Sequence, residues 1–258
     1  MKLKNLATML VAIAATATLF ATPAQATLLG RDINGHAVAG SDVSAVFLYD
    51  ADLNITWLRD ANASATAGNT NDPWGKGYGG FMTWDGANTW ATSLTVGVFS
   101  GWRLPTTLQP DASCEYQFDP GVPFAIQGQG YECSGSEMGR LFLIELGNKA
   151  YCIPGTHCTV QPGWGLTNTG DFQNLYPFVY WSGTEFALDT YYTWFFSMGS
   201  GGQSLRGKDV ESQLAMAVRP GDVLVASVPE PGTLLLVAAA VAALGVVRRR
   251  RAIGTSET

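Results

Sequence analysis

The sequence predicts an α+β fold for the body of the chain, with two main helices and antiparallel strands. Two segments in the middle of the body carry apolar residues at helical spacing. Strand-like runs precede the first of these segments and follow the second. Helices and strands are thus segregated along the chain instead of alternating, which is typical of α+β folds. Because the first and last strands bracket the helices, they are expected to pair in one sheet.

The first strands are predicted at 44–49 and 55–58, where β-branched and aromatic residues are frequent. The Asp- and Asn-containing segment 50–54 between them is expected to form a hairpin turn. Residues 61–80 are rich in Ala, Ser, Asn and Gly and are predicted to form a loop. A strand end is expected at 96–99.

Two helices follow from the apolar spacing. The first begins near Thr83, which is a suitable N-cap, as is Asp85. Its apolar stripe consists of Trp84, Ala87, Trp90, Ala91 and Leu94. The second lies in SGSEMGRLFLIELGNK, where Ser134 and Glu137 have capping-box spacing and Gly147 is placed to end the helix. Its apolar face consists of Met138, Leu141, Phe142 and Leu146.

Three strands are predicted after the second helix, at 178–181, 191–196 and 214–219. The segment 199–203, GSGGQ, is expected to reverse the chain between the last two. Two irregular stretches, of which 108–131 is the first, complete the body.

The N-terminus has the pattern of a secretory signal peptide. Lys2 and Lys4 precede an apolar segment at 6–20, and Ala24-Gln25-Ala26 is a small-x-small cleavage site. We therefore expect signal peptidase to remove residues 1–26, although an uncleaved anchor helix is the alternative.

The C-terminus combines a proline-containing motif, an apolar run and a basic block. Residues 233–247 are apolar and span about 22 Å as a helix, somewhat less than the roughly 30 Å hydrocarbon core. Positive residues that follow such a helix are expected to stay cytoplasmic and stop transfer. The block consists of Arg248, Arg249, Arg250 and Arg251.

This tail closely resembles the PEP-CTERM sorting signal. The matching motif is Val228, Pro229, Glu230 and Pro231, followed by the apolar helix and the arginine block. The resemblance implies processing by exosortase, a membrane protease-transpeptidase that cuts near the motif. It also implies an inner-membrane-tethered precursor in a Gram-negative cell, then delivery to the cell surface or extracellular matrix. The expected organisation is a signal peptide at 1–26, an exported domain at 27–227, the sorting signal at 228–251 and a tail at 252–258.

The charge of the body excludes one class of partner. Residues 27–229 hold 9 of the 15 basic and 19 of the 21 acidic residues, a net charge near −10. Nucleic acid and anionic lipid require a basic footprint, so neither is expected as a partner.

The cysteines are expected to form disulfides, because the exported compartment is oxidising. The four residues are Cys114, Cys133, Cys152 and Cys158. Three pairings are possible, and sequence proximity favours 114 with 133 and 152 with 158. A metal site is disfavoured because the spacings differ from those of zinc sites, and no cofactor is expected.

A second resemblance covers most of 45–222. The segments TWLRDAN, TWDGANTWATSL, GWRLPT, SEMGRLF, YWSGTEF, YYTWFFSMGSGGQ and AMAVRPGD occur in this order. The series resembles the Lcl C-terminal domain family, long catalogued as a domain of unknown function, which also closes a collagen-like surface adhesin. It implies a C-type-lectin-like fold related to the formylglycine-generating enzyme. The motif residues, for which a structural role is expected, are Trp102, Arg103, Leu104, Pro105, Thr106, Tyr180, Trp181, Ser182 and Arg219.

Catalytic and metal sites of related folds have no counterpart in the sequence. The segment 161–163, Gln-Pro-Gly, lacks the carboxylate of a calcium-lectin tripeptide, and no cysteine follows Cys158. A Ser-His-Asp triad is disfavoured because the two histidines are His36 and His157, one near the mature N-terminus and one in a cysteine-flanked loop.

Arg103 is expected to need a carboxylate partner, Glu137 by preference or Glu145. Arg219 is expected to have a similar role on the last strand. The side chains of Trp102, Trp181 and Trp194 are expected in the core.

These observations favour a non-enzymatic surface or matrix protein that contacts polysaccharide or another envelope component. One alternative is a secreted carbohydrate-active enzyme, for which Glu185 and Asp189 are the carboxylates to inspect. Another is a structural spacer. The sequence leaves the ligand unassigned.

Overall fold

The computed structural model describes residues 28–119, 121, 126–209 and 212–224. The signal peptide, the sorting motif, the predicted membrane helix and the arginine block lie outside them. No helix in the described ranges has the length and apolar character needed to cross a membrane.

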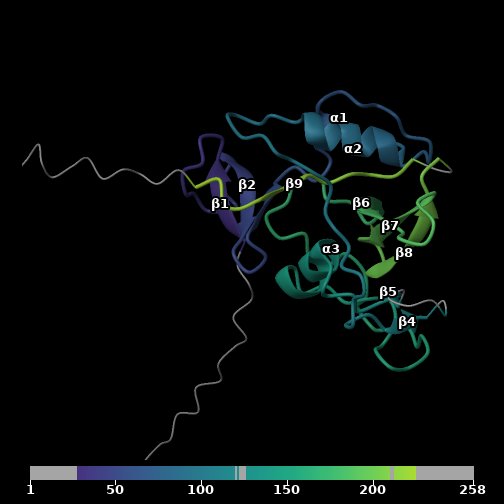
Figure 1. The fold of residues 1–258 in the computed structure, drawn as a ribbon. Helices are drawn as coiled ribbons and strands as arrows, with labels where there is room; N and C mark the ends of the chain where they lie inside the picture. Colours follow the sequence, from purple (N-terminus) through teal and green to yellow (C-terminus); the bar gives the residue numbers. More distant parts are fainter. Residues whose placement is uncertain (1–27, 120, 122–125, 210–211, 225–258) are drawn as a thin grey trace, which may run out of the picture.

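The fold combines antiparallel sheets with a few short helices (Figure 1). A four-stranded sheet has the order β1-β2-β3-β9, and a three-stranded sheet has the order β6-β7-β8. A hairpin, β4–β5, lies next to β8 at the lower end of the second sheet (Figure 1). The strands of the first sheet are β1 Leu29–Asp32, β2 Ala45–Asp50, β3 Ile55–Leu58 and β9 Val218–Pro220. The other strands are β4 Tyr116–Phe118, β5 Gln127–Gln129, β6 Val179–Glu185, β7 Tyr192–Ser197 and β8 Gly202–Gly207.

The first and last strands meet in one sheet, as predicted. β9 pairs with β3, and the Arg31 guanidinium binds the Asp222 carboxylate with N–O distances of 3.0 and 2.7 Å. The two ends of the described body therefore lie together.

The first predicted helix is confirmed. α2 spans Trp84–Ser93, and the Thr83 hydroxyl accepts a hydrogen bond from the Gly86 amide. Ala87 and Ala91 are fully buried. A one-turn helix, α1 Ala63–Thr66, interrupts the stretch predicted to be a loop.

The second predicted helix is shorter than expected. It consists of one α-helical turn, α3 Glu137–Arg140, and a π-helical turn, η1 Leu141–Glu145. The predicted capping box is wrong, because the Glu137 carboxylate binds Arg103 and the Thr106 amide, while the Ser134 amide donates to the Glu132 carbonyl. Gly147, at φ 62°, ends the helix as predicted.

Other strand predictions need correction. Residues 96–99 form a tight turn closed by two backbone hydrogen bonds between Val96 and Phe99, not a strand end. The final predicted strand is divided: Gln213 bridges Met82, Leu214 bridges β6, and only 218–220 join β3.

The core lies between the two sheets and the helices. The predicted core tryptophans Trp102, Trp181 and Trp194 are at most 2% exposed. The indole nitrogen of Trp181 donates to the Met82 carbonyl, and that of Trp102 donates to the Phe99 carbonyl.

Candidate functional site

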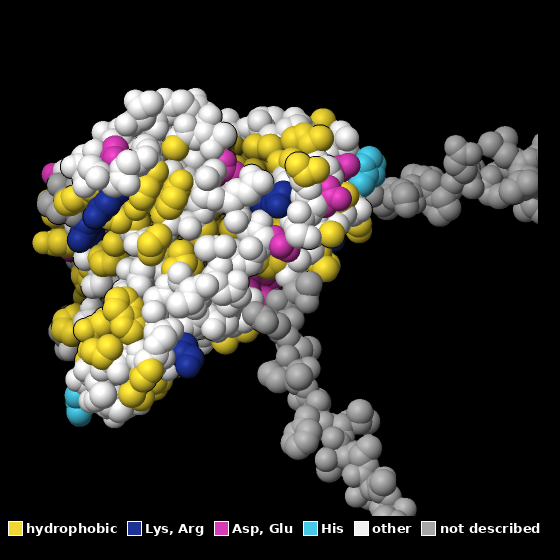
Figure 2. Space-filling model, turned by 180° about the vertical axis from the view of Figure 1, so that it is seen from behind, with side chains coloured by type: hydrophobic (Ala, Val, Ile, Leu, Met, Phe, Trp, Pro, Cys, Tyr) yellow, Lys and Arg dark blue, Asp and Glu magenta, His cyan; other side chains and the backbone are white. Residues whose placement is uncertain are grey.

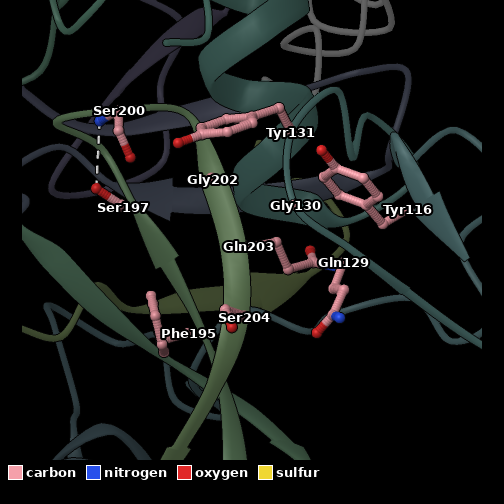
Figure 3. Close-up of a pocket in the computed structure, with 10 residues that line it drawn as sticks. All are labelled: Tyr116, Gln129, Gly130, Tyr131, Phe195, Ser197, Ser200, Gly202, Gln203 and Ser204. Atoms are coloured by element: carbon pink, nitrogen blue, oxygen red, sulfur yellow. Dashed lines mark hydrogen bonds between the residues drawn. The ribbon is translucent and has the colours of Figure 1, made fainter. Parts of the chain in front are cut away.

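A cavity of about 340 Å³ lies between the β4–β5 hairpin and the strands β7 and β8 (Figure 3). Its volume is at the small end of the roughly 300–1,000 Å³ typical of ligand sites. The residues that line it are Tyr116, Gln129, Gly130, Tyr131, Phe195, Ser197, Ser200, Gly202, Gln203 and Ser204.

Backbone pairing fixes the two walls of the cavity. The Gly130 amide donates to the Gln203 carbonyl at 2.9 Å, and the Gln203 amide donates back at 2.7 Å. The buried Gln203 side chain reaches towards the hairpin and donates from Nε2 to the Gly128 carbonyl at 3.1 Å. The Cys114–Cys133 disulfide joins the two segments that flank the hairpin. The hairpin wall is therefore closed by a disulfide and held to β8 by hydrogen bonds.

Three aromatic rings face the cavity from opposite walls. Tyr116 and Tyr131 come from the hairpin side, and Phe195 comes from β7 (Figure 3). Gly130 makes the Tyr116 position possible, because at φ 91° a Cβ there would lie 2.6 Å from the Tyr116 Cδ2 atom. Tyr116 remains 43% exposed and is accessible to a ligand.

The aromatic surface continues beyond the cavity. The rings of Tyr131 and Tyr151 are 6.3 Å apart, and Trp164 packs edge-on against Tyr151 at 4.7 Å. Figure 2 shows hydrophobic side chains gathered at the lower left of that view, on the part of the molecule that contains the hairpin in Figure 1. Phe118 of β4 and Trp164 are both exposed.

The polar side chains of the lining are uncharged. Within the described ranges, five of them make no side-chain hydrogen bond to the protein: Tyr116, Gln129, Tyr131, Ser200 and Ser204. Burial, followed by the nearby Tyr151, raises the pKa of the Tyr131 hydroxyl, which keeps it a hydrogen-bond donor at neutral pH. The cavity thus offers free donors and acceptors beside aromatic faces.

In the part of the chain that the structure describes, charged groups lie around the cavity and not in its lining. Glu115 and Glu132 flank the hairpin, and desolvation followed by the charge of Glu115 raises the pKa of Glu132. On the opposite side, the Arg206 guanidinium lies 5.3 Å from the Phe195 ring centroid.

A second cavity, of about 410 Å³, lies beside the first sheet and α1. Its lining is largely apolar and includes Val43, Val46 and Leu58. The Arg59 side chain at its wall is fixed by the carbonyls of Asp42, Ala45 and Asp171. The second cavity therefore offers fewer free polar groups to a ligand than the first cavity.

The WRLPT segment, residues 102–106, connects β9, α3 and β6. The Arg103 backbone exchanges two hydrogen bonds with Val218, and the Arg103 guanidinium binds Glu137 of α3 at 2.7 and 2.8 Å. The Pro105 carbonyl accepts hydrogen bonds from Ser182 and Gly183 of β6. The predicted partner of Arg103 is confirmed as Glu137.

The remaining motif residues also have packing roles. Leu104 and Trp181 belong to one buried cluster, and the Tyr180 hydroxyl accepts a hydrogen bond from the Tyr176 amide. The expectation for Arg219 needs correction, because its Nε donates to the Ser100 carbonyl and its guanidinium lies over Phe99, with no carboxylate partner in the described part of the chain.

The disulfides connect Cys114 with Cys133 and Cys152 with Cys158, the pairing that sequence proximity favoured. In the described ranges, Asp111, Cys114 and Cys133 bring their ligand atoms within 4.8 Å of one another. Because both cysteines are disulfide-bonded, neither supplies a thiolate to a metal.

The candidate catalytic carboxylates have structural partners. Glu185 pairs with Lys208, and Asp189 accepts a hydrogen bond from the Tyr191 amide. The histidines lie apart in the fold: His36 pairs with Asp32 after β1, and His157 lies in the Cys152–Cys158 loop. Neither the two carboxylates nor the two histidines line the cavity, so they do not place an acid and a base across it.

Sequence reasoning missed the cavity. The motif YYTWFFSMGSGGQ contains five of its residues, from Phe195 to Gln203, but spacing within one segment does not reveal that a hairpin some 70 residues earlier packs against it. Tyr116 and Tyr131 lie in a stretch predicted to be irregular.

Comparison with protein families identifies one match, the PEP-CTERM protein-sorting motif, at residues 227–251. This confirms the resemblance of the tail. The motif implies exosortase-dependent sorting of an exported chain to the cell surface. Searches of curated proteins and of solved structures found no match.

Proposed function

Starting from this sorting motif, we propose that the exported domain is a non-enzymatic binding module that attaches to polysaccharide of the cell envelope or extracellular matrix. Exosortase brings the chain to the place where such polymers occur. The domain then makes the contact through the cavity between the β4–β5 hairpin and β8.

One observation carries this proposal: uncharged polar groups and aromatic rings line the same cavity, and five of those polar side chains are free to bind a ligand. Sugars present apolar C–H faces and hydroxyl edges together, so they match a surface that combines both kinds of group. Ligand sites generally have an apolar and aromatic lining with a few placed polar groups.

The domain assignment is part of the proposal. The ordered motif series supports an Lcl C-terminal-like, C-type-lectin-like domain at 27–227. The buried tryptophans and the contacts of the WRLPT segment agree with structural roles for those motifs. Fold resemblance alone does not supply a ligand, so the binding role rests on the cavity.

The route to the surface is also proposed. The precursor is cleaved by signal peptidase after residue 26 and held in the inner membrane by the helix at 233–247 until exosortase acts. The proximity of the two ends of the body, fixed by Arg31 and Asp222, leaves the rest of the domain accessible when it is tethered at one end.

A co-sedimentation assay tests the binding role. Polysaccharide is isolated from the medium and surface of cells that produce the chain, and the full-length protein is added in a sugar-free detergent. The Ser204→Trp variant places an indole in the cavity, and Thr89→Trp adds the same side chain on the exposed face of α2.

Wild type and Thr89→Trp are expected to sediment with the polymer, and Ser204→Trp is expected to remain in the supernatant. Equal sedimentation of all three proteins would show that the cavity is not the polysaccharide-binding site. Release of shorter sugars from the polymer, lost on Glu185→Gln, would favour the secreted enzyme instead.

A further inference from the structure

We infer that the cavity selects an uncharged, hydroxyl-rich sugar, as in a neutral glucan or mannan, over an acidic polysaccharide. This inference rests on the proposed function and names the ligand class for the same cavity. It follows from three properties of the walls: ring placement, hydrogen-bond character and charge.

Each wall of the cavity carries both an aromatic ring and polar side chains. Tyr131 and Tyr116 come from the hairpin side, whereas Ser204 lies on β8, Ser200 lies in the preceding turn, and Phe195 and Ser197 lie on β7 (Figure 3). A pyranose that packs its C–H face against a tyrosine ring directs its hydroxyl groups towards Ser200 and Ser204. Aromatic side chains with a polar end suit such a half-apolar ligand.

The hydrogen-bonding groups favour a ligand that donates as well as accepts. Serine hydroxyls and glutamine amides do both. The amide of Gln203 is oriented by its Nε2 bonds to the Gly128 carbonyl and Cys114 sulfur, and its buried Oε1 has no hydrogen-bond partner in the described part of the chain. The hydroxyl groups of a sugar donate to, and accept from, the free tyrosine and serine hydroxyls of the lining, whereas an ionised carboxylate group only accepts.

Charge disfavours an anionic ligand. Among the described residues, the lining carries no charged side chain, and Glu115 and Glu132 lie beside the hairpin. Arg206 is a cation near the opposite wall, where it lies over the Phe195 ring. With a net charge near −10 over 27–229, the domain as a whole repels polyanions.

The test compares neutral and acidic polymers of known composition. Full-length protein in sugar-free detergent is titrated calorimetrically with laminarin, dextran and mannan, and with polygalacturonate and hyaluronan. We expect at least one neutral polymer to bind, with an affinity that changes less than twofold between 0.05 and 0.5 M salt, since no ion pair is screened.

Variants locate the binding. Tyr131→Phe removes one hydroxyl and is expected to weaken binding about three- to tenfold. Tyr116→Ala removes an exposed ring and is expected to weaken it at least tenfold. Tyr192→Ala removes the ring of a comparably exposed residue, 39% against 43% for Tyr116, that does not line the cavity, and is expected to leave affinity unchanged. Near-ultraviolet circular dichroism verifies that each variant is folded.

Gln129→Glu separates the ligand classes. The substitution keeps the shape of the side chain but replaces its amide donor with a negative charge, so a neutral polymer is expected to lose about three- to tenfold, as for Tyr131→Phe, and a polyanion much more.

Tighter binding of polygalacturonate or hyaluronan than of every neutral polymer would overturn the neutral-sugar inference and leave the proposed binding function in place. Failure of all five polymers, together with failure of the polymer isolated from producing cells, would overturn both.

Discussion

Arg103 and Glu137 form a bidentate ion pair that joins the WRLPT segment to α3. Nη1 lies 2.8 Å from Oε2 and Nη2 lies 2.7 Å from Oε1. The same carboxylate accepts the Thr106 amide at 2.7 Å, and the Arg103 guanidinium also donates to the Leu104 carbonyl. One carboxylate therefore fixes both the side chain and the backbone of the segment.

Replacement of this pair is expected to destabilise the protein. Glu137→Ala removes three charge-assisted hydrogen bonds and leaves the Thr106 amide unpaired, at a cost of about 2–4 kcal/mol. Arg103→Lys cannot reproduce the two parallel bonds and is expected to cost about 1–2 kcal/mol. Urea denaturation measures both, and Lys149→Ala, at an exposed position, is the control. Equal midpoints for Glu137→Ala and the control would contradict a structural role for the pair.

The Arg103–Glu137 pair is an example of a contact that the sequence predicts correctly. A partly buried arginine needs a carboxylate, and Glu137 was available on a predicted helix. The pairing of β3 with β9 followed from strands at both ends of the body, and the disulfides followed from proximity. In each of these cases the sequence offered only a few possible partners, so simple rules of charge, strand order and proximity were enough to select the correct one.

The missed elements depend on contacts distant in sequence. β8, with the sequence GQSLRG, lacks the β-branched and aromatic residues of a strand, and forms because β7 and Gly130 supply partners for its backbone. The hairpin β4–β5 has only three residues in each strand. The cavity exists because these two weakly predicted elements meet, so no local pattern indicates it.

Gly139 is expected to resist substitution although it lies in a helix. Ala normally stabilises a helix relative to Gly by about 1 kcal/mol. A Cβ at position 139 would lie 1.8 Å from the Cys133 carbonyl oxygen, a backbone atom in a disulfide-linked segment. Gly139→Ala is therefore expected to destabilise by about 1–3 kcal/mol.

Thermal unfolding of Gly139→Ala provides the measurement. Gly183→Ala is the control, because the nearest atom to its added Cβ is the Leu104 Cβ at 3.4 Å, an ordinary contact. A midpoint for Gly139→Ala at or above wild type would show that α3 can move away from Cys133.

Glu145 is expected to make stability depend on pH. Desolvation, followed by the charge of Asp50, raises its pKa from 4.5 to about 7, against the opposing effect of Arg140, whose Nε is 3.2 Å from the carboxylate. Burial also raises the pKa of Asp50, and Asp52 binds the same arginine. These are the charged groups that act on Glu145.

The sign follows from proton binding. Because the folded state holds the Glu145 proton more tightly than the unfolded state, the contribution to stability is complete below pH 4.5 and is lost as pH rises through 7. Glu145→Gln keeps a neutral side chain at all pH values, and Arg140 retains Asp52. The variant is expected to match wild type near pH 5 and to exceed it by up to about 3 kcal/mol at pH 8.

Urea denaturation at pH 5, 6.5 and 8 measures this dependence. Glu185→Gln, at an exposed carboxylate, is expected to follow the wild-type curve. If Glu145→Gln were less stable than wild type at pH 8, the ion pair with Arg140 would outweigh the burial of the charge.

The Cys114–Cys133 disulfide is expected to support both stability and binding. It closes a loop with a sequence separation of 19, against 6 for Cys152–Cys158. Constraint of the unfolded chain gives about 3.3 kcal/mol for the longer loop and about 2.4 kcal/mol for the shorter. The longer loop contains the hairpin wall, so its loss also releases Tyr116 and Gly128 from fixed positions.

Paired serine substitutions separate these two effects. Cys114→Ser with Cys133→Ser is expected to lower the unfolding midpoint and to weaken polysaccharide binding at least tenfold below that midpoint, because the two segments that flank the hairpin wall are no longer joined. Cys152→Ser with Cys158→Ser is expected to lower the midpoint by a smaller amount and to preserve binding, since neither residue lines the cavity. Undiminished binding by the first double variant while folded would mean that the backbone pairing of Gly130 with Gln203 is sufficient to hold the wall.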